Sequence, residues 1–304
     1  MSNGAMIMGD WSPWIVALVL NKLLLYLAVA ASAASVFMLS QSQNPALNRF
    51  SWRYGVWGAG LGLLLAGLDF FLQVGLFADA GWAGLLDNSV IVMLWDSPLG
   101  SQLVWRVIGF LLLMTVLLWA LWQALNLNWV LVGIAMLALM CLSFACLQAG
   151  HTAEQAFWVR LALSMHFLLG LWWMGCLWPL AVSCKHLTVK DLQQLMQRFG
   201  TVASCLVPVL LVAGLGLAYA LTGSFQHLLT TTHGQLLMMK IALVVGLLGF
   251  AAYHKLKLVP QLTEPTKALR LQRSIYQEMV LGFAVLLLTA VASSVFGPAV
   301  LMNE

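Results

Sequence analysis

The chain contains few charged residues. Asp, Glu, Lys and Arg make up 8% of its 304 residues, whereas 62% are hydrophobic and the mean hydropathy is +0.94. Soluble domains usually carry roughly 25% charged residues, so water is not the solvent for most of this surface. The formal net charge of +4 does not predict a nucleic-acid partner, because the basic residues stand at the edges of apolar stretches, where membrane orientation explains them.

Two further absences narrow the chemistry. The sequence has no Gly-x-x-x-x-Gly-Lys-[Ser/Thr] loop, so ATP hydrolysis is not the expected driving force. Its cysteines form no Cys-x-x-Cys pair, so a disulfide framework is not expected and each is by default a small packing residue. The five cysteines are Cys141, Cys146, Cys176, Cys184 and Cys205.

Long apolar stretches fill the rest of the chain. A helix needs about 20 apolar residues to cross the hydrocarbon core of a bilayer, and helices satisfy their own backbone hydrogen bonds there. We therefore predict an all-α polytopic membrane protein, a bundle of about eight transmembrane helices in a single domain over residues 1–304, with the first stretch retained as a helix. The predicted spans are Trp11–Leu39, Trp52–Phe77, Leu99–Ala124, Leu127–Ala149, Ala156–Val182, Phe199–Leu221, Gln235–Tyr253 and Tyr276–Phe296.

The basic residues predict the orientation of the bundle. The first, fifth and seventh loops carry Lys and Arg, whereas the second, fourth and sixth carry none. Basic loops favour the cytoplasm, so both termini are expected on the outer side, which is the periplasm if the protein lies in a bacterial inner membrane. The basic loop residues are Arg49, Arg53, Lys185, Lys190, Arg198, Lys255, Lys257, Lys267, Arg270 and Arg273.

Ionisable side chains within the predicted spans are functional candidates, because burying them in a membrane is unfavourable. Lys22 and Asp69 lie at similar depths on neighbouring helices, so they are expected to form an ion pair, with Arg106 as the alternative partner of Asp69. Glu278 is expected to pair near the cytoplasmic edge, for example with Arg273. His166 and Lys240 are further candidates. The small residues Gly58 and Gly62 predict close helix packing, within the bundle or in a homodimer.

Histidine and sulfur side chains gather toward the outer half. His151, His227 and His233 fall in outer loops, and His166 lies inside the fifth span. Imidazole suits copper, zinc, iron and nickel, whereas thioether and thiolate ligands favour Cu(I). Taken singly, each of these residues is more often structural. The sulfur residues at matching depths are Met140 and Cys141 beside Met165, and Met238 below the outer end of the seventh span.

Two segments resemble a known family. The run from His166 to Leu180, HFLLGLWWMGCLWPL, and the run from Thr232 to Lys240, THGQLLMMK, are similar to segments of the copper resistance D (CopD) family, and the resemblance is strongest over residues 150–298. It implies an inner-membrane protein that moves copper, inward from the periplasm, in copper homeostasis or resistance. It also implies a separate periplasmic CopC-like copper-binding partner. The protein is predicted to be a transporter rather than an enzyme.

On that resemblance, depth in the membrane suggests a role for each candidate ligand. His151, His227 and His233 would form an outer entry site for copper. His166, with Met165, Met140 and Cys141, would carry copper within the membrane, where Cu(I) is favoured, and Met238 is a further candidate ligand. The expected partners are therefore copper, the CopC-like protein and the lipid bilayer, with a homodimer left open.

Two other functions fit the same residues. A haem-b electron-transfer protein would hold its haem between histidines on facing helices, and His166 could be one axial ligand, although a second histidine at equal depth is missing. A non-transporting sensor or docking protein for a periplasmic copper carrier would use the outer loops instead. Metal analysis and a visible spectrum separate the three functions.

Overall fold

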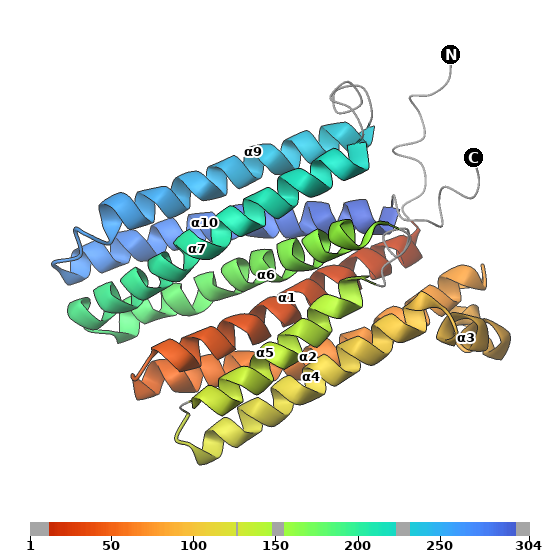
Figure 1. Cartoon of the computed structure of the whole chain (residues 1–304), viewed down its shortest axis with the longest axis horizontal. Helices are drawn as coiled ribbons and strands as arrows, with labels where there is room; N and C mark the ends of the chain where they lie inside the picture. The colour runs from red at the N-terminus through yellow and green to blue at the C-terminus, as the bar shows by residue number, and fades with distance from the viewer. Residues whose placement is uncertain (1–11, 126, 148–154, 223–231, 296–304) are drawn as a thin grey trace.

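The eight predicted membrane helices are present in the structure, a computed structural model that describes residues 12–125, 127–147, 155–222 and 232–295 (Figure 1). Each is long and apolar enough to cross a membrane, and the described residues contain no strand, so the predicted fold class is confirmed. The long helices are α1 (Pro13–Gln41), α2 (Pro45–Phe77), α4 (Pro98–Trp122), α5 (Trp129–Leu147), α6 (Phe157–His186), α7 (Val189–Thr222), α9 (Thr232–Tyr253) and α10 (Pro265–Val295).

Three short elements join the long helices within the described ranges. The 3-10 turn η1 (Gly81–Gly84) and the helix α3 (Asn88–Trp95) connect α2 to α4, and the π-helical turn η3 (His254–Leu258) follows α9. Asp87 begins α3 by accepting hydrogen bonds from the Ser89 hydroxyl and from the backbone N–H groups of Ser89 and Val90. The hydroxyl bond, followed by the backbone bonds, lowers the pKa of the exposed Asp87 carboxyl.

Helix ends extend beyond several predicted spans. The structure begins α2 at Pro45 rather than Trp52, α7 at Val189 rather than Phe199, and α10 at Pro265 rather than Tyr276. Hydropathy marks only the part of a helix that lies in hydrocarbon, whereas these first turns are polar and basic. Proline at the first turn is typical of a helix start, because a backbone N–H at that position would have no partner within the helix.

Consecutive long helices run in opposite directions, so the connections gather at two ends of the bundle (Figure 1). One end, here called the basic end, holds the α1–α2, α4–α5, α6–α7 and α9–α10 connections. The opposite end, here called the terminal end, holds the start of α1 and the end of α10. The basic loop residues predicted to face one side all fall toward the basic end. Arg160, which lies within a predicted span and not among these loop residues, stands near the start of α6 at the terminal end.

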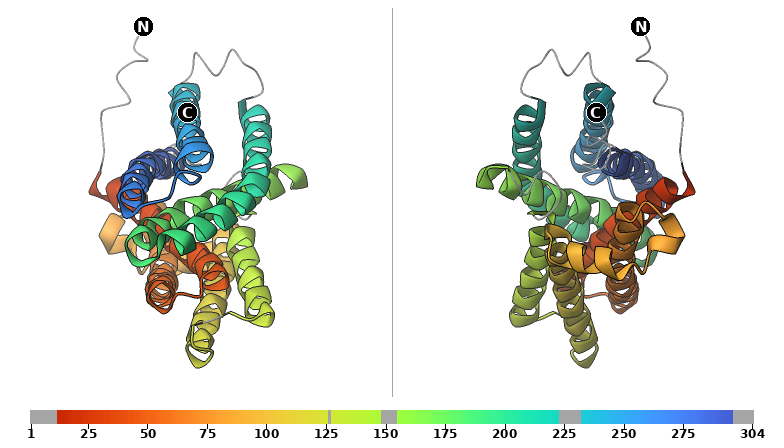
Figure 2. Two further views of the ribbon diagram at one scale, coloured as in Figure 1. Left: turned by 90° about the vertical axis from the view of Figure 1, so that its left-hand side faces the viewer. Right: turned by 90° about the vertical axis from the view of Figure 1, so that its right-hand side faces the viewer.

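The bundle has two lobes joined by α1 and α6, which lie at its centre (Figure 2). Helix α1 packs on α2, α6 and α10, and α6 packs on α1, α7, α10 and α5. Helices α2, α4 and α5 form one lobe. On the other side, α9 packs on α10, and α7 packs mainly on α6. Most of the outer surfaces of α7 and α9 are apolar and exposed, as expected for helices that face lipid.

Small residues allow the central helices to approach closely. A Cβ on Gly58 would lie 2.8 Å from the Ala31 side chain and 3.0 Å from the Ala28 carbonyl oxygen of α1, and Gly62 packs under the ring of Phe110 on α4. The predicted close packing is therefore confirmed, and this face is occupied within the bundle. At Gly175 on α6, a Cβ would overlap the backbone carbonyl of Ala30.

Gly175→Ala is expected to lower the free energy of unfolding by about 1–3 kcal/mol, because the added methyl group would push α6 away from the α1 backbone. The matched control is Gly67→Ala, since a Cβ at Gly67 meets nothing within 4 Å. Both glycines lie inside membrane helices, so helix propensity changes equally. Thermal unfolding in detergent measures both variants, and equal stability of the two would contradict close α1–α6 packing at Gly175.

Candidate functional site

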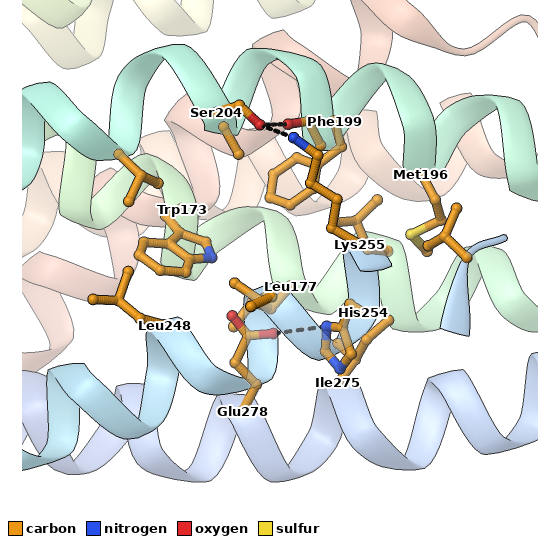
Figure 3. A pocket seen from close by; sticks show the side chains of 17 residues that line it. Trp173, Leu177, Met196, Phe199, Ser204, Leu248, His254, Lys255, Ile275 and Glu278 are labelled. Atoms are coloured by element: carbon orange, nitrogen blue, oxygen red, sulfur yellow. Dashed lines mark hydrogen bonds and ion pairs between the residues drawn. The ribbon is translucent and has the colours of Figure 1, made fainter. Parts of the chain in front are cut away.

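A cavity of about 210 Å³ lies near the basic end, between α6, α7, α10 and the junction of α9 with η3 (Figure 3). Its wall is mostly apolar. This volume could hold several water molecules, each of which takes about 30 Å³ of liquid volume. Apolar lining residues include Trp173 and Leu177 from α6, Phe199 and Ala203 from α7, Leu248 from α9 and Ile275 from α10.

The polar centre of this cavity is an acid–imidazole pair. Glu278 on α10 is only 1% exposed, and its Oε2 lies 3.2 Å from Nδ1 of His254. The other ring nitrogen of His254, Nε2, lies 2.8 Å from the Ser274 hydroxyl. The second carboxylate oxygen of Glu278, Oε1, has no hydrogen-bond partner among the described residues. The predicted pairing of Glu278 with Arg273 is replaced by a pairing with His254.

The π-helical turn explains how His254 reaches Glu278. Helix α9 ends at Tyr253, and the wider turn of η3 then directs His254 toward α10 while Lys255 bonds to α7. The Lys255 ammonium donates a hydrogen bond to the hydroxyl of Ser204, which lies on the opposite wall (Figure 3). Single π-turns inside or after α-helices are rare and frequently occur at functional sites.

His166 occupies a second polar position, on α6 toward the terminal end. Its Nδ1 lies 2.9 Å from the backbone carbonyl oxygen of Leu210 on α7. A carbonyl oxygen only accepts, so Nδ1 carries the proton in this bond and Nε2 of the neutral ring keeps a free lone pair. Gly214 makes room for the ring, because a Cβ there would lie 2.8 Å from Cε1 and 3.0 Å from Nδ1 of His166.

His166 and the cavity lie along one interface between α6 and α7. Residues 166, 173, 177 and 180 follow helical spacing on one face of α6, and the last three line the cavity. Opposite them on α7, Gly214 and Leu210 contact His166, whereas Ala203 and Gly200 line the cavity. The eleven positions from His166 to Leu177 correspond to about 16 Å along the helix axis.

The predicted sulfur residues on α5 and α6 lie at the depth of His166. The Ser143 and Ser164 hydroxyls are hydrogen-bonded to each other, and Ser164 also donates to the Ser143 carbonyl at 2.8 Å, which fixes the register of α5 against α6. This register places Cys141 opposite His166. Met140 and Met165 are 64% and 46% exposed, respectively, and therefore lie on the outside of the bundle, whereas Cys141 is buried.

Among the described residues, His166 and the predicted sulfur ligands do not form one cluster. His166 bonds to α7, whereas Met140 and Cys141 lie on α5, and Met238 on α9 is 43% exposed. Within the described ranges, no group of three or more His, Cys, Asp or Glu side chains could hold a metal ion. The binding of copper by these sulfur residues stays a prediction.

The outer histidines are only partly covered by the structure. His151 and His227 lie outside the described residues. His233 belongs to the first turn of α9, but its side chain is outside the description. The predicted entry site at the terminal end therefore stays a prediction.

A buried ion pair lies in the other lobe. Arg106 Nη1 on α4 lies 2.6 Å from Oδ2 of Asp69 on α2, and the side-chain amide of Asn21 donates to Oδ1 of Asp69 at 3.2 Å. Lys22 instead donates to the Ser293 carbonyl of α10 at 3.1 Å. The expected Lys22–Asp69 pair is therefore wrong and the Arg106 alternative is confirmed. Sequence reasoning missed Asn21, which is neutral and was not among the ionisable candidates.

Comparison with known proteins gives one match. Residues 193–292 match the family model described as copper resistance protein D. This region includes most of α7 and α10 and all of α9 and η3, and so contains Glu278 and His254. No curated protein and no solved structure matches the chain. The resemblance predicted from the sequence is thus confirmed over this region: the chain is similar to copper resistance protein D over residues 193–292, and its long apolar helices are those of a multi-pass membrane protein.

Proposed function

We propose that this protein moves copper ions across a bacterial inner membrane, from the periplasm toward the cytoplasm. The match to copper resistance protein D carries the proposal, because it covers the helices that close the cavity on three sides. The terminal end would then face the periplasm and receive copper from a CopC-like protein. The basic end would face the cytoplasm, as the distribution of Lys and Arg favours.

His166 is the proposed ligand within the membrane. Its Nε2 lone pair is free, and the bond from Nδ1 to the Leu210 carbonyl holds the ring in one tautomer. Metal-binding histidines commonly donate their second ring nitrogen in this way, which fixes the ring and makes the ligand nitrogen more basic. Met165, Met140, Cys141 and Met238 are the proposed sulfur ligands, with His151, His227 and His233 as the proposed entry site.

Inward movement of a cation needs no ATP. A membrane potential of about 100 mV, negative inside, contributes about 2.3 kcal/mol for each positive charge that crosses. Copper that leaves His166 would follow the α6–α7 interface into the cavity at the basic end. The small residues Gly200 and Ala203 line the cavity at the end of this path.

Copper uptake by vesicles that contain the purified protein tests the proposal. Elemental analysis of the vesicle interior should show copper accumulation driven by an inside-negative potential, above the level of protein-free vesicles. A visible spectrum of the same preparation is recorded first. A Soret band with bound iron would favour the electron-transfer function, and an absence of both copper uptake and haem would favour the docking function.

A further inference from the structure

Within the described part of the chain, the Glu278 carboxyl group has one oxygen without a hydrogen-bond donor, at the wall of a mostly apolar cavity. The side chain is 1% exposed, and Oε1 has no hydrogen-bond partner among the described residues. Figure 3 shows the carboxyl group at the cavity, with its other oxygen bonded to His254. A buried carboxylate oxygen without a donor is unfavourable, because desolvation is not compensated. A proton or a water molecule in the cavity would satisfy it.

The other groups around the cavity define the charge that Glu278 meets. Its titratable or charged lining residues are Glu278, His254 and Lys255. The lining residues from α6 and α7 include none, since α7 contributes Ser204 as its polar side chain and α6 contributes apolar ones. Lys255 bonds to Ser204 across the cavity, so its ammonium group is held apart from the acid–imidazole pair.

The pair is better suited to bind a proton than a metal ion. Both ring nitrogens of His254 already have partners, Glu278 at 3.2 Å and Ser274 at 2.8 Å. That leaves one free carboxylate oxygen, whereas a copper site needs several nitrogen or sulfur ligands. A carboxyl–imidazole pair, in contrast, can hold or release one proton without moving its heavy atoms.

We infer that Glu278 and His254 form a proton-binding site that opens into the cavity at the basic end, and that a proton bound there competes with a copper ion that enters the cavity. The second half of this inference rests on the proposed copper transport. Gain of one proton makes the net charge of the pair more positive by one unit, and loss of that proton restores it. A nearby cation therefore favours the deprotonated pair, and the protonated pair disfavours the cation.

Infrared difference spectroscopy of the copper-free protein tests the proton site directly. Acidification from about pH 9 to about pH 5 should produce the C=O stretch of a protonated carboxyl group. The band should vanish in Glu278→Gln and shift in His254→Gln. It should persist in Glu264→Gln, which removes an exposed carboxylate near the basic end. A wild-type spectrum without this band, or a band that Glu278→Gln retains, would overturn the site.

Copper flux tests the competition separately. In wild-type vesicles, acidification should slow copper uptake by up to about tenfold per pH unit when one proton competes. Glu278→Gln should reduce this dependence while Glu264→Gln keeps it. Equal pH dependence of wild type and Glu278→Gln would contradict the competition. If wild-type vesicles take up no copper but the infrared band is present, the copper function fails and the proton site stands. Size-exclusion profiles establish that each variant is folded.

Discussion

Arg106→Met is expected to destabilise the protein by about 3–5 kcal/mol, the range measured when one partner of a buried ion pair is removed. Arg106 Nη1 lies 2.6 Å from Oδ2 of Asp69, and Asp69 is only 4% exposed. Without the guanidinium group, the carboxylate would keep only the amide of Asn21 as a partner for its charge. Unfolding in detergent with increasing denaturant measures the loss.

Two further variants test the cause of that loss. Arg53→Met removes an exposed arginine near the basic end and should change stability by less than about 0.5 kcal/mol. Asp69→Asn combined with Arg106→Met removes both charges, so it should recover part of the stability lost in the single variant. Wild-type stability of Arg106→Met would show that the pair contributes nothing to the fold.

The spans could be predicted from the sequence because a bilayer imposes a fixed apolar length on every helix. The helix ends could not, since nothing in hydropathy distinguishes a polar first turn from a loop. Local signals were nevertheless present. Asn44 before Pro45 is a typical helix start, and in the structure the Asn44 side chain accepts hydrogen bonds from the backbone of Ala46 and Leu47.

The partner of Asp69 shows what depth alone leaves undetermined. Lys22 lies at a suitable depth, but adjacent residues on a helix point about 100° apart. Asn21 therefore contacts Asp69 on α2, whereas Lys22 contacts Ser293 on α10. The rotation of each helix about its axis depends on packing with helices distant in sequence, which the periodicity of an almost uniformly apolar span does not reveal.

The cavity at the basic end was missed for a related reason. Glu278 was a candidate because it is an acid inside a span, but His254 was not among the candidate residues. Their contact depends on the π-helical turn after Tyr253, which sequence patterns did not indicate. The sequence did contain one indication of this contact: an acid inside a span, with a histidine at the basic end of the preceding helix.

His166→Ala is expected to reduce copper uptake to the level of protein-free vesicles, because it removes the one described imidazole in the outer half whose position supports a ligand role. The matched control is His186→Ala, which removes an exposed histidine at the end of α6 and should leave uptake unchanged. Copper content of the vesicles is the measurement. Wild-type uptake by His166→Ala would exclude His166 from the copper path.

Gly214→Val tests the same site without removing the ligand. A Cβ at Gly214 would lie 2.8 Å from Cε1 of His166, so the ring must turn and its bond to the Leu210 carbonyl is lost. Loss of such an orienting partner typically weakens metal binding by about 10–100-fold. Gly216→Val is the matched control, since its nearest contact would be the Trp158 ring at 3.9 Å. Weaker copper binding in Gly214→Val alone would show that the orientation of His166, and not merely its presence, determines the affinity.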